Sequence, residues 1–233
     1  MQQHFSLQVK EFWQAQLLNV ASPTQIPMAK RSHLRQENVD YVIQELTLES
    51  ITTSALQSLV ETSELDFKTL LLGAWALLLS RYNTFQNVIF GATYELDKVL
   101  PVKVQVASDE SLVVWLKNLQ REWLALEPYK NVSLKQIKQW SSWVESVPLF
   151  DSCLVFEDAN WSASLDCSLI LNVDGTRWRS LKLYYDDRKF DKNAIARLLG
   201  HLQTLLEGMA ANPQQRFERF TPFNGNRKAS ITR

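Results

Sequence analysis

The stretch LLLGAWALLLSRYNTFQNVIFGATY, residues 70–94, decides the fold of this chain. It contains most of a predicted helix, Phe67–Tyr82, that is apolar on nearly every side, which is typical of a helix covered by several other elements. The apolar run Val88–Thr93 follows after a short polar break and predicts a buried strand. A helix that needs cover on several sides, next to a buried strand, predicts a layered domain with this helix at its centre.

Hydrophobic periodicity predicts further helices and strands on both sides of this stretch. The expected helices are Leu7–Asn19, a helix capped by Ser50 or Thr52, a helix from Ser111 to Pro128, Ser133–Trp140, and a helix from Asp191 to Asn212. The expected strands are Val39–Leu48, Leu100–Val106, Phe150–Phe156, Leu165–Val173 and Trp178–Tyr185, the last two forming a hairpin. This order predicts an α/β (α+β) fold, a single layered lobe with a mixed sheet covered by helices. We expect one domain over residues 1–223 and a flexible tail over residues 224–233.

The composition of the 233 residues excludes several classes of protein. Hydrophobic residues make up 45% and charged residues 21%, which provides a substantial core and argues against intrinsic disorder. The 25 basic and 25 acidic residues balance, so neither nucleic acid nor a membrane surface is an expected partner. The longest apolar run, Leu70–Leu79, is too short to cross a bilayer. Because the first residues also lack the pattern of a secretory signal, we expect a cytoplasmic protein.

Few residues carry a pattern typical of catalysis. His4, His33 and His201 lack the spacing of a metal site, and the six glycines form no dinucleotide-binding or P-loop motif. The two cysteines, Cys153 and Cys167, are expected to be reduced thiols in the core. The sequence therefore predicts no catalytic, cofactor-binding or metal-binding residue.

The eight tryptophans are more informative. Trp140, Trp143 and Trp161 lie in or beside expected loops instead of on the apolar stripe of a helix. Exposed aromatic side chains at such places can anchor a partner protein, whereas buried ones would belong to the local core. We therefore name these three as candidate partner contacts, and the core alternative stays open.

Several blocks of the sequence resemble the condensation domains of nonribosomal peptide synthetases. They are residues 70–94, LPVKVQVASDESLVVWLKNLQREWLALEPY (100–129), SLKQIKQWSSW (133–143), PLFDSCLVFED (148–158) and LKLYYDDRKFDKNAIARLLGHLQTLLEGMAANPQQR (181–216). The resemblance extends from Leu7 to Phe217 and corresponds to the C-terminal lobe of that family. It implies a chloramphenicol-acetyltransferase-like fold, in which two lobes form a V and substrates tethered to carrier proteins by phosphopantetheine arms enter from opposite faces.

The sequence departs from the family pattern in two places. The family forms amide bonds with an H-H-x-x-x-D-G motif in its N-terminal lobe, and this chain contains no adjacent histidines. The family also has a longer excursion before the L-P-V run, which bridges the lobes. Here only the short segment Thr93–Val99 stands in its place, so we expect the bridge to be deleted. The length is also about half of the two-lobed architecture, so we expect a truncated domain.

Two functions follow from the resemblance. The first is a noncatalytic docking or accessory component of nonribosomal peptide or hybrid polyketide biosynthesis, which binds a carrier protein or a synthetase module and leaves the phosphopantetheine to that partner. The second is a half-enzyme completed in trans, by an N-terminal-lobe partner or as a homodimer, that forms amide or ester bonds on carrier-bound substrates. An acyltransferase site on this lobe would have only Cys153, His201 and Asp186 to build on. A relic without a dedicated role is the remaining alternative.

Overall fold

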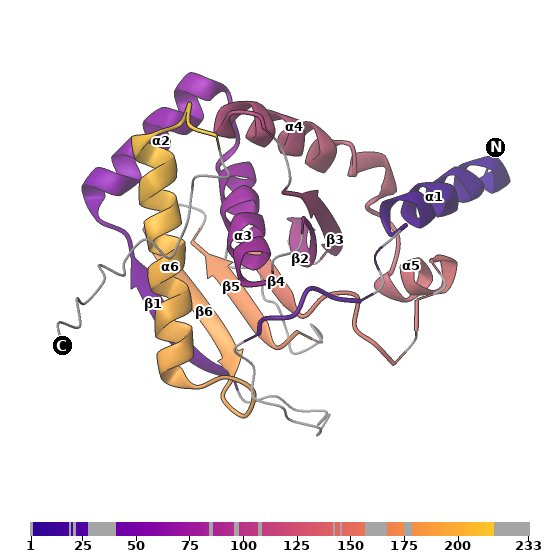
Figure 1. The fold of residues 1–233 in the computed structure, drawn as a ribbon. Coiled ribbons are helices and arrows are strands. Elements are labelled where there is room, and N and C mark those ends of the chain that lie inside the picture. Colours follow the sequence, from indigo (N-terminus) through magenta and orange to yellow (C-terminus); the bar gives the residue numbers. More distant parts are fainter. Residues whose placement is uncertain are drawn as a thin grey trace, which may run out of the picture.

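The computed structural model describes residues 2–18, 20, 22–27, 41–83, 86–95, 98–106, 109–141, 143–144, 146–156, 167–174 and 179–216. These residues form a six-stranded mixed sheet in the order β1-β6-β5-β4-β2-β3 (Figure 1). The strands are β1 (Tyr41–Thr47), β2 (Asn87–Glu95), β3 (Lys98–Gln105), β4 (Ser152–Phe156), β5 (Leu169–Val173) and β6 (Ser180–Asp186). Strand β4 runs parallel to β2 and β5, and the other pairs are antiparallel. The predicted fold class is confirmed.

The helices divide into two groups (Figure 1). Four of them lie on one face of the sheet: α2 (Ser50–Ser63), α3 (Phe67–Asn83), α4 (Leu112–Leu124) and α6 (Lys192–Ala211). The other two, α1 (Gln2–Gln16) and α5 (Leu134–Trp140), pack against each other to one side. A short 3-10 helix, η1 (Glu127–Tyr129), connects α4 to α5. The chain order of helices and strands is the one that the sequence predicts.

Helix α3 is the centre of the domain, as its apolar sequence predicts. Every residue from Thr69 to Ser80 is buried, and α3 packs against α2, α4, α6 and β2. The indole Nε1 of the fully buried Trp75 donates a hydrogen bond of 3.2 Å to Ser152 Oγ, which satisfies both polar groups inside the core. Gly73 permits the close approach of α4, because a Cβ atom there would lie 2.4 Å from Leu116 Cδ2.

Two predicted helix caps, Ser111 and Asp191, are confirmed, and two helix ends were predicted wrongly. Both residues, and also Ser133 at the start of α5, accept a hydrogen bond from a backbone N–H in the first turn of their helix. The N-cap of α2 is Glu49, not Ser50 or Thr52, because Glu49 still has extended backbone angles while its carbonyl oxygen already accepts the N–H of Thr53. Helix α4 ends at Leu124, and Pro128, which the sequence suggested as its end, lies inside η1.

Strands β4 and β5 begin later than predicted, because tertiary contacts compete with their apolar pattern. Strand β4 begins at Ser152, since Phe150 turns away to pack on β2. Strand β5 begins at Leu169 instead of Leu165, because the backbone of Ser168 bonds to Asp151 and Asp186 outside the ladder. The predicted tail over residues 224–233 lies outside the described residues.

Candidate functional site

His201, the one histidine whose side chain is among the described residues, links two helices. The Tyr82 hydroxyl lies 2.6 Å from His201 Nδ1, which joins α3 to α6. Burial lowers the pKa of His201, and the nearby Arg197 charge adds to this effect. The imidazole is therefore neutral at pH 7 and engaged in helix packing. His33 and the side chain of His4 lie outside the described residues.

A nucleophilic site on this lobe would need Cys153, Asp186 and His201. Each of these side chains contacts a different group. Cys153 is a buried free thiol in β4, and its Sγ contacts the carbonyl oxygen of Leu154 at 3.6 Å. Asp186 at the end of β6 binds Arg188, and His201 binds Tyr82. Cys167 is also a buried free thiol. Within the described part of the chain, no three His, Cys, Asp or Glu residues are placed to hold a metal ion.

Asp186 stabilises the turn between β6 and α6. Its two carboxylate oxygens accept hydrogen bonds of 2.8 and 2.9 Å from the Arg188 guanidinium, and Oδ1 also accepts one of 3.0 Å from the Arg188 backbone N–H. Burial alone would raise the pKa of Asp186, but these bonds and the Arg188 charge outweigh it and lower the pKa. This arrangement agrees with the strand-to-helix turn that the sequence indicates for Asp186.

The candidate tryptophans occupy different environments. Trp140 and Trp143 are partly buried and pack against the edge of the core. The Nε1 of Trp143 donates to the carbonyl oxygen of Val147 at 3.1 Å, and the carbonyl oxygen of Trp140 accepts from Gln14 Nε2 at 2.8 Å. Trp161 lies outside the described residues. Both described tryptophans therefore support the packing of α5, and a partner could reach only their exposed parts.

One half of the sheet is closed on the face opposite the four helices. The ring of Phe150 lies on Gly91 in β2, so closely that a Cβ atom at Gly91 would be 2.5 Å from the nearest ring carbon. The backbone N–H of Ile89 donates a hydrogen bond of 2.8 Å to Thr24 Oγ1, which brings the segment after α1 against β2. Pro101 of β3, opposite Gly91, is also buried. The chain itself covers this half on both faces.

The other half of the sheet is open on the same face. The strand register places Ile43 of β1 beside Tyr184 of β6, and Glu45 beside Lys182. Ile43 is 52% exposed, and Glu45 and Lys182 are exposed. The side chains that alternate with them in β6 are buried on the helix side; they are Leu181, Leu183 and Tyr185. We call the surface formed by Ile43, Glu45, Lys182 and Tyr184 the open sheet face.

The open sheet face was not predicted from the sequence, although the sequence contains a signal for it. Residues 180–185 alternate between polar and apolar side chains, which is typical of a strand covered on one face only. Strand β1, which pairs with β6, is distant from it in the sequence. The alternation in residues 180–185 therefore does not show which residues lie beside Lys182. Only the pairing of β1 with β6 brings Ile43 and Glu45 to that place.

The turn between β2 and β3 is short and bordered by charges. Only residues 96–97 separate the two strands, and the deletion of the family's bridge stays a prediction from the sequence. Lys130 forms ion pairs with Glu95 and Glu127, and these two carboxylates raise its pKa. Burial, together with a hydrogen bond to Glu127, raises the pKa of Tyr94 to about 12. The charges bind the strand ends to η1, so this end of the sheet is fixed by its own chain.

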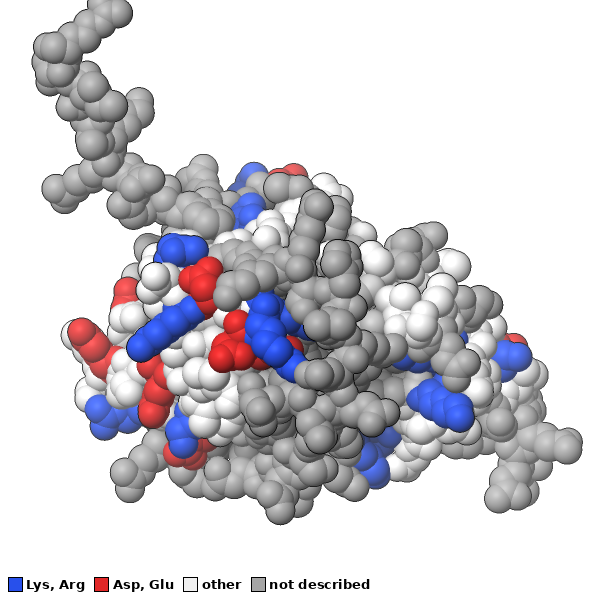
Figure 2. Space-filling view, turned by 90° about the horizontal axis from the view of Figure 1, so that it is seen from below, with Lys and Arg blue, Asp and Glu red and all other residues white. Residues whose placement is uncertain are grey.

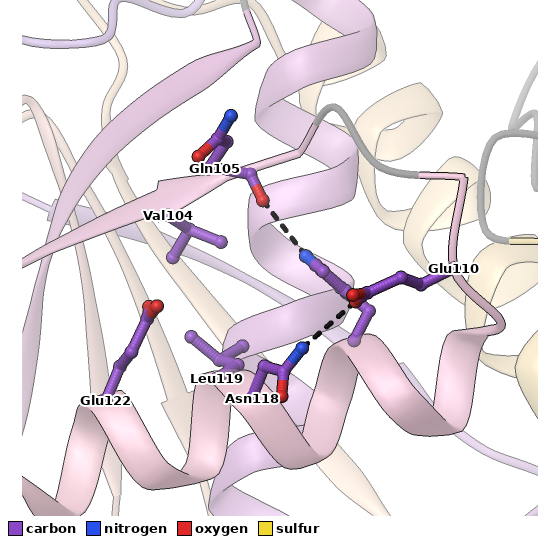
Figure 3. A pocket seen from close by; sticks show the side chains of 7 residues that line it. Val104, Gln105, Glu110, Asn118, Leu119 and Glu122 are labelled. Carbon is purple, nitrogen blue, oxygen red and sulfur yellow. Dashed lines mark hydrogen bonds between the residues drawn. The ribbon is translucent and has the colours of Figure 1, made fainter.

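A shallow hollow of about 230 Å³ lies between the end of β3 and α4 (Figure 3). Its lining residues are Val104, Gln105, Glu110, Trp115, Asn118, Leu119 and Glu122. The indole Nε1 of Trp115 donates to the Gln105 carbonyl oxygen at 2.9 Å, and Asn118 Nδ2 donates to Glu110 Oε2 at 3.0 Å. Burial raises the pKa of Glu122, although its side chain keeps contact with solvent. The hollow is acidic and has one aromatic wall.

The surface charge is mixed. In the view from below, acidic and basic side chains alternate, and neither sign forms a continuous patch among the described residues (Figure 2). This agrees with the balanced composition. No helix in the described ranges is long and apolar enough to cross a membrane.

Comparisons with known proteins agree with this architecture. Residues 1–95 match the family model of the condensation domain. The chain is 30% identical to a linear gramicidin synthase of Brevibacillus parabrevis, over 90% of this chain and 3% of that protein. It is 28% identical to chondramide synthase of Chondromyces crocatus, over 89% of this chain and 6% of that protein. The chain thus spans a small part of these relatives.

Solved structures show the same fold. The X-domain from teicoplanin biosynthesis, solved in complex with OxyB, superposes with a TM-score of 0.76 at 20% identity, over 92% of this chain and 55% of that one. A four-domain nonribosomal peptide synthetase bound to AMP and glycine superposes with a TM-score of 0.77 at 14% identity, over 90% of this chain and 20% of that one. The resemblance to condensation domains is confirmed.

Proposed function

We propose that this chain, a relative of the condensation domains of nonribosomal peptide synthetases, is a noncatalytic docking component that binds a carrier protein or a synthetase module. The observation that carries the proposal is the open sheet face. It combines one exposed apolar side chain, Ile43, with the flanking charges Glu45 and Lys182. An apolar centre inside a polar rim is typical of interfaces between proteins that associate and separate.

The chemistry of the described residues favours docking over catalysis by this chain alone. The sequence contains no H-H-x-x-x-D-G motif, and His201 is neutral and bound to Tyr82. Amide formation in the related family depends on that motif. In this proposal the phosphopantetheine arm and its substrate belong to the carrier protein, and this chain supplies a binding surface.

The comparison with the teicoplanin X-domain supports a docking role for this fold. That domain was solved in a complex with OxyB, so a domain that contains this fold can serve as the partner of another protein. At 20% identity, this comparison supports only the same fold for this chain. The partner of this chain has to be identified by experiment.

The second candidate function is a half-enzyme completed in trans. The observation in its favour is that this chain spans 55% of the X-domain chain that it matches. An N-terminal-lobe partner, or a second copy of this chain, would then supply what a two-lobed domain contains. Catalysis would appear only in the complex.

Binding calorimetry with a matched pair of variants tests the docking proposal. Ile43→Glu places a charge at the centre of the open sheet face, and Ile51→Glu places one on α2, where Ile51 is 75% exposed on the helix side. We expect Ile43→Glu to weaken binding of a holo carrier protein or a synthetase module about tenfold or more, because an interface centre tolerates unpaired charge poorly. The control Ile51→Glu should bind as the unmodified chain does. Equal binding by both variants would remove the open sheet face as the docking site.

An amide-forming assay separates the two candidate functions. Donor and acceptor substrates on carrier proteins are incubated with this chain alone and with an added N-terminal lobe. The docking proposal predicts no turnover in either mixture. Turnover in the second mixture alone would identify the half-enzyme, and turnover by the chain alone would contradict both candidates.

A further inference from the structure

The two edge strands of the sheet, β1 and β3, differ in how they are protected (Figure 1). Strand β3, KVLPVKVQ, contains Lys98, Pro101 and Lys103, which are the residue types that commonly block an edge strand from pairing with another chain. Lys103 Nζ also donates a hydrogen bond of 3.0 Å to the carbonyl oxygen of Leu18. Strand β1, YVIQELT, contains no lysine, arginine, proline or glycine and consists mainly of residues that favour strands. The sheet therefore has one blocked edge and one edge that can accept a further strand.

The outer edge of β1 carries a row of backbone groups that no strand in the described part of the chain pairs with. Just after β1, the Leu48 N–H donates a hydrogen bond of 2.7 Å to the Arg179 carbonyl oxygen, so the backbone of Leu48 faces β6. Backbone N–H and C=O groups of an antiparallel strand point to alternate sides from one residue to the next. The groups of the odd-numbered residues of β1 therefore point away from the sheet; these residues are Tyr41, Ile43, Glu45 and Thr47.

A second copy of β1 matches this edge in its hydrogen-bonding pattern. Antiparallel pairing about a twofold axis at Gln44 places Ile43 opposite Glu45 of the second copy, and Tyr41 opposite Thr47 of the second copy. All four are residues whose backbone groups point outward, so each facing pair can exchange its N–H and C=O groups. The whole length of β1 then pairs without a bulge or an overhang.

The side chains of β1 also suit a second copy. On the helix side, this register places Val42, which is 38% exposed, beside the half-buried Leu46 of the second copy, and the twofold axis repeats the contact. On the open sheet face, the two Glu45 side chains do not lie directly opposite each other. Each Glu45 accepts a hydrogen bond from Ser180 and lies beside Lys182 in its own copy. The pairing thus covers apolar surface and opposes no like charges.

We infer that two copies of this chain form a dimer by antiparallel pairing of their β1 strands, which joins both sheets into one continuous sheet. Because the edge at β3 is blocked, the assembly ends at two copies. The twofold axis is perpendicular to the sheet, so the open sheet faces of both copies lie on the same side. The dimer needs no carrier protein or synthetase module, and the inference therefore does not rest on the docking proposal.

Sedimentation of the full chain, without any partner protein, tests the inference with a matched pair of variants. The unmodified chain should sediment as a dimer. Val42→Lys places a charge in the apolar pair on the helix side of β1 and should weaken dimerisation about tenfold or more. Val114→Lys is the control, because Val114 is 46% exposed on α4, and it should dimerise as the unmodified chain does. Val42 lies on the face opposite Ile43, so Val42→Lys leaves the open sheet face unchanged. A strict monomer, or equal dimerisation of both variants, would overturn the inference.

A cross-link tests the register and does not depend on the stability of Val42→Lys. In Gln44→Cys, the two new cysteines face each other across the axis with their Cα atoms about 4.5 Å apart, which a disulfide can span. The control Thr47→Cys places its two cysteines about 20 Å apart, at about 3.4 Å per residue. The native cysteines are buried, so under mild oxidation we expect a covalent dimer from Gln44→Cys alone. Equal cross-linking of both variants, or a chain that stays monomeric until a synthetase module is added, contradicts pairing of β1 with a second copy.

Discussion

The two halves of the sheet differ on the face opposite the helices. Around β2 and β4, the ring of Phe150 rests on Gly91, and both strands are buried on both faces. At β1 and β6, Ile43 is 52% exposed and the charges of Glu45 and Lys182 face solvent. On this face, the half of the sheet around β2 and β4 is therefore covered by other parts of the chain, whereas the half formed by β1 and β6 has side chains exposed to solvent.

The difference shows how stability and interaction are divided in this lobe. The closed half depends on close contacts between rigid groups, so substitutions there should cost folding free energy. In β6 of the open half, side chains alternate between the buried helix side, with Leu181, Leu183 and Tyr185, and the opposite side, where Lys182 is exposed. Substitutions on its open face should leave folding nearly unchanged and alter binding instead.

The largest effect is expected for Phe150→Ala in the closed half. Phe150 is 4% exposed, and its removal leaves a cavity over Gly91 that rigid strands cannot fill. We expect a loss of about 3–5 kcal/mol in the free energy of unfolding, measured by chemical denaturation. A loss below about 1 kcal/mol would mean that this face is not closed by the ring.

The next effect is expected for Gly91→Ala, which adds a methyl group under the Phe150 ring. Because three ring carbons lie 2.5–2.9 Å from the position of the new Cβ, either the ring or the strand has to move. Such overpacking costs about 1–3 kcal/mol. The double variant Gly91→Ala/Phe150→Leu makes room for the methyl group and should be less destabilised than the sum of the single variants, as a double-mutant cycle will show. Additive losses would contradict direct contact between the two positions.

The sequence predicts the closed half better than the open one, for a physical reason. Apolar runs such as Val88–Thr93 identify strands that are buried on both sides, and the continuous apolar surface of α3 identifies the helix above them. The start of β4 was misplaced because Phe150 continues the apolar run but leaves the strand to cover Gly91. A local pattern does not tell which apolar residue stays in a strand and which one covers its neighbour.

The candidate sites depend even more than the strands on contacts between residues that are distant in the sequence. Trp140 and Trp143 drew attention as aromatic residues near loops, but they pack against the core, since α1 and α5 meet there. The open sheet face joins residues of β1 and β6, and the hollow joins the end of β3 to α4. Each of these requires the topology of the sheet, which periodicity alone does not provide.

A smaller effect is expected at Asp186, where β6 leaves the sheet for α6. Asp186→Asn removes the charge that Arg188 binds and should cost about 1 kcal/mol at pH 7, since Arg188 is partly exposed. Because folding lowers the pKa of Asp186, its contribution is complete above the ordinary carboxyl pKa of 3.8 and is lost as the pH falls through the lower value in the folded state. Denaturation curves of both proteins should therefore converge toward acid pH. A difference that persists unchanged at pH 2 would contradict the role of the charge.

The smallest effect is expected for Ile43→Ala on the open sheet face. A side chain that is 52% exposed loses little apolar contact when it is shortened, so the free energy of unfolding should change by less than about 0.5 kcal/mol. The same substitution at Ile89, which is 1% exposed on the same face of the closed half, should cost about 2–5 kcal/mol. The ratio of the two losses measures the contrast between the halves, since residue type and sheet face are matched while β1 is an edge strand and β2 is paired on both sides. If both losses were large, the chain itself would cover the open sheet face, and a docking partner would have to bind elsewhere.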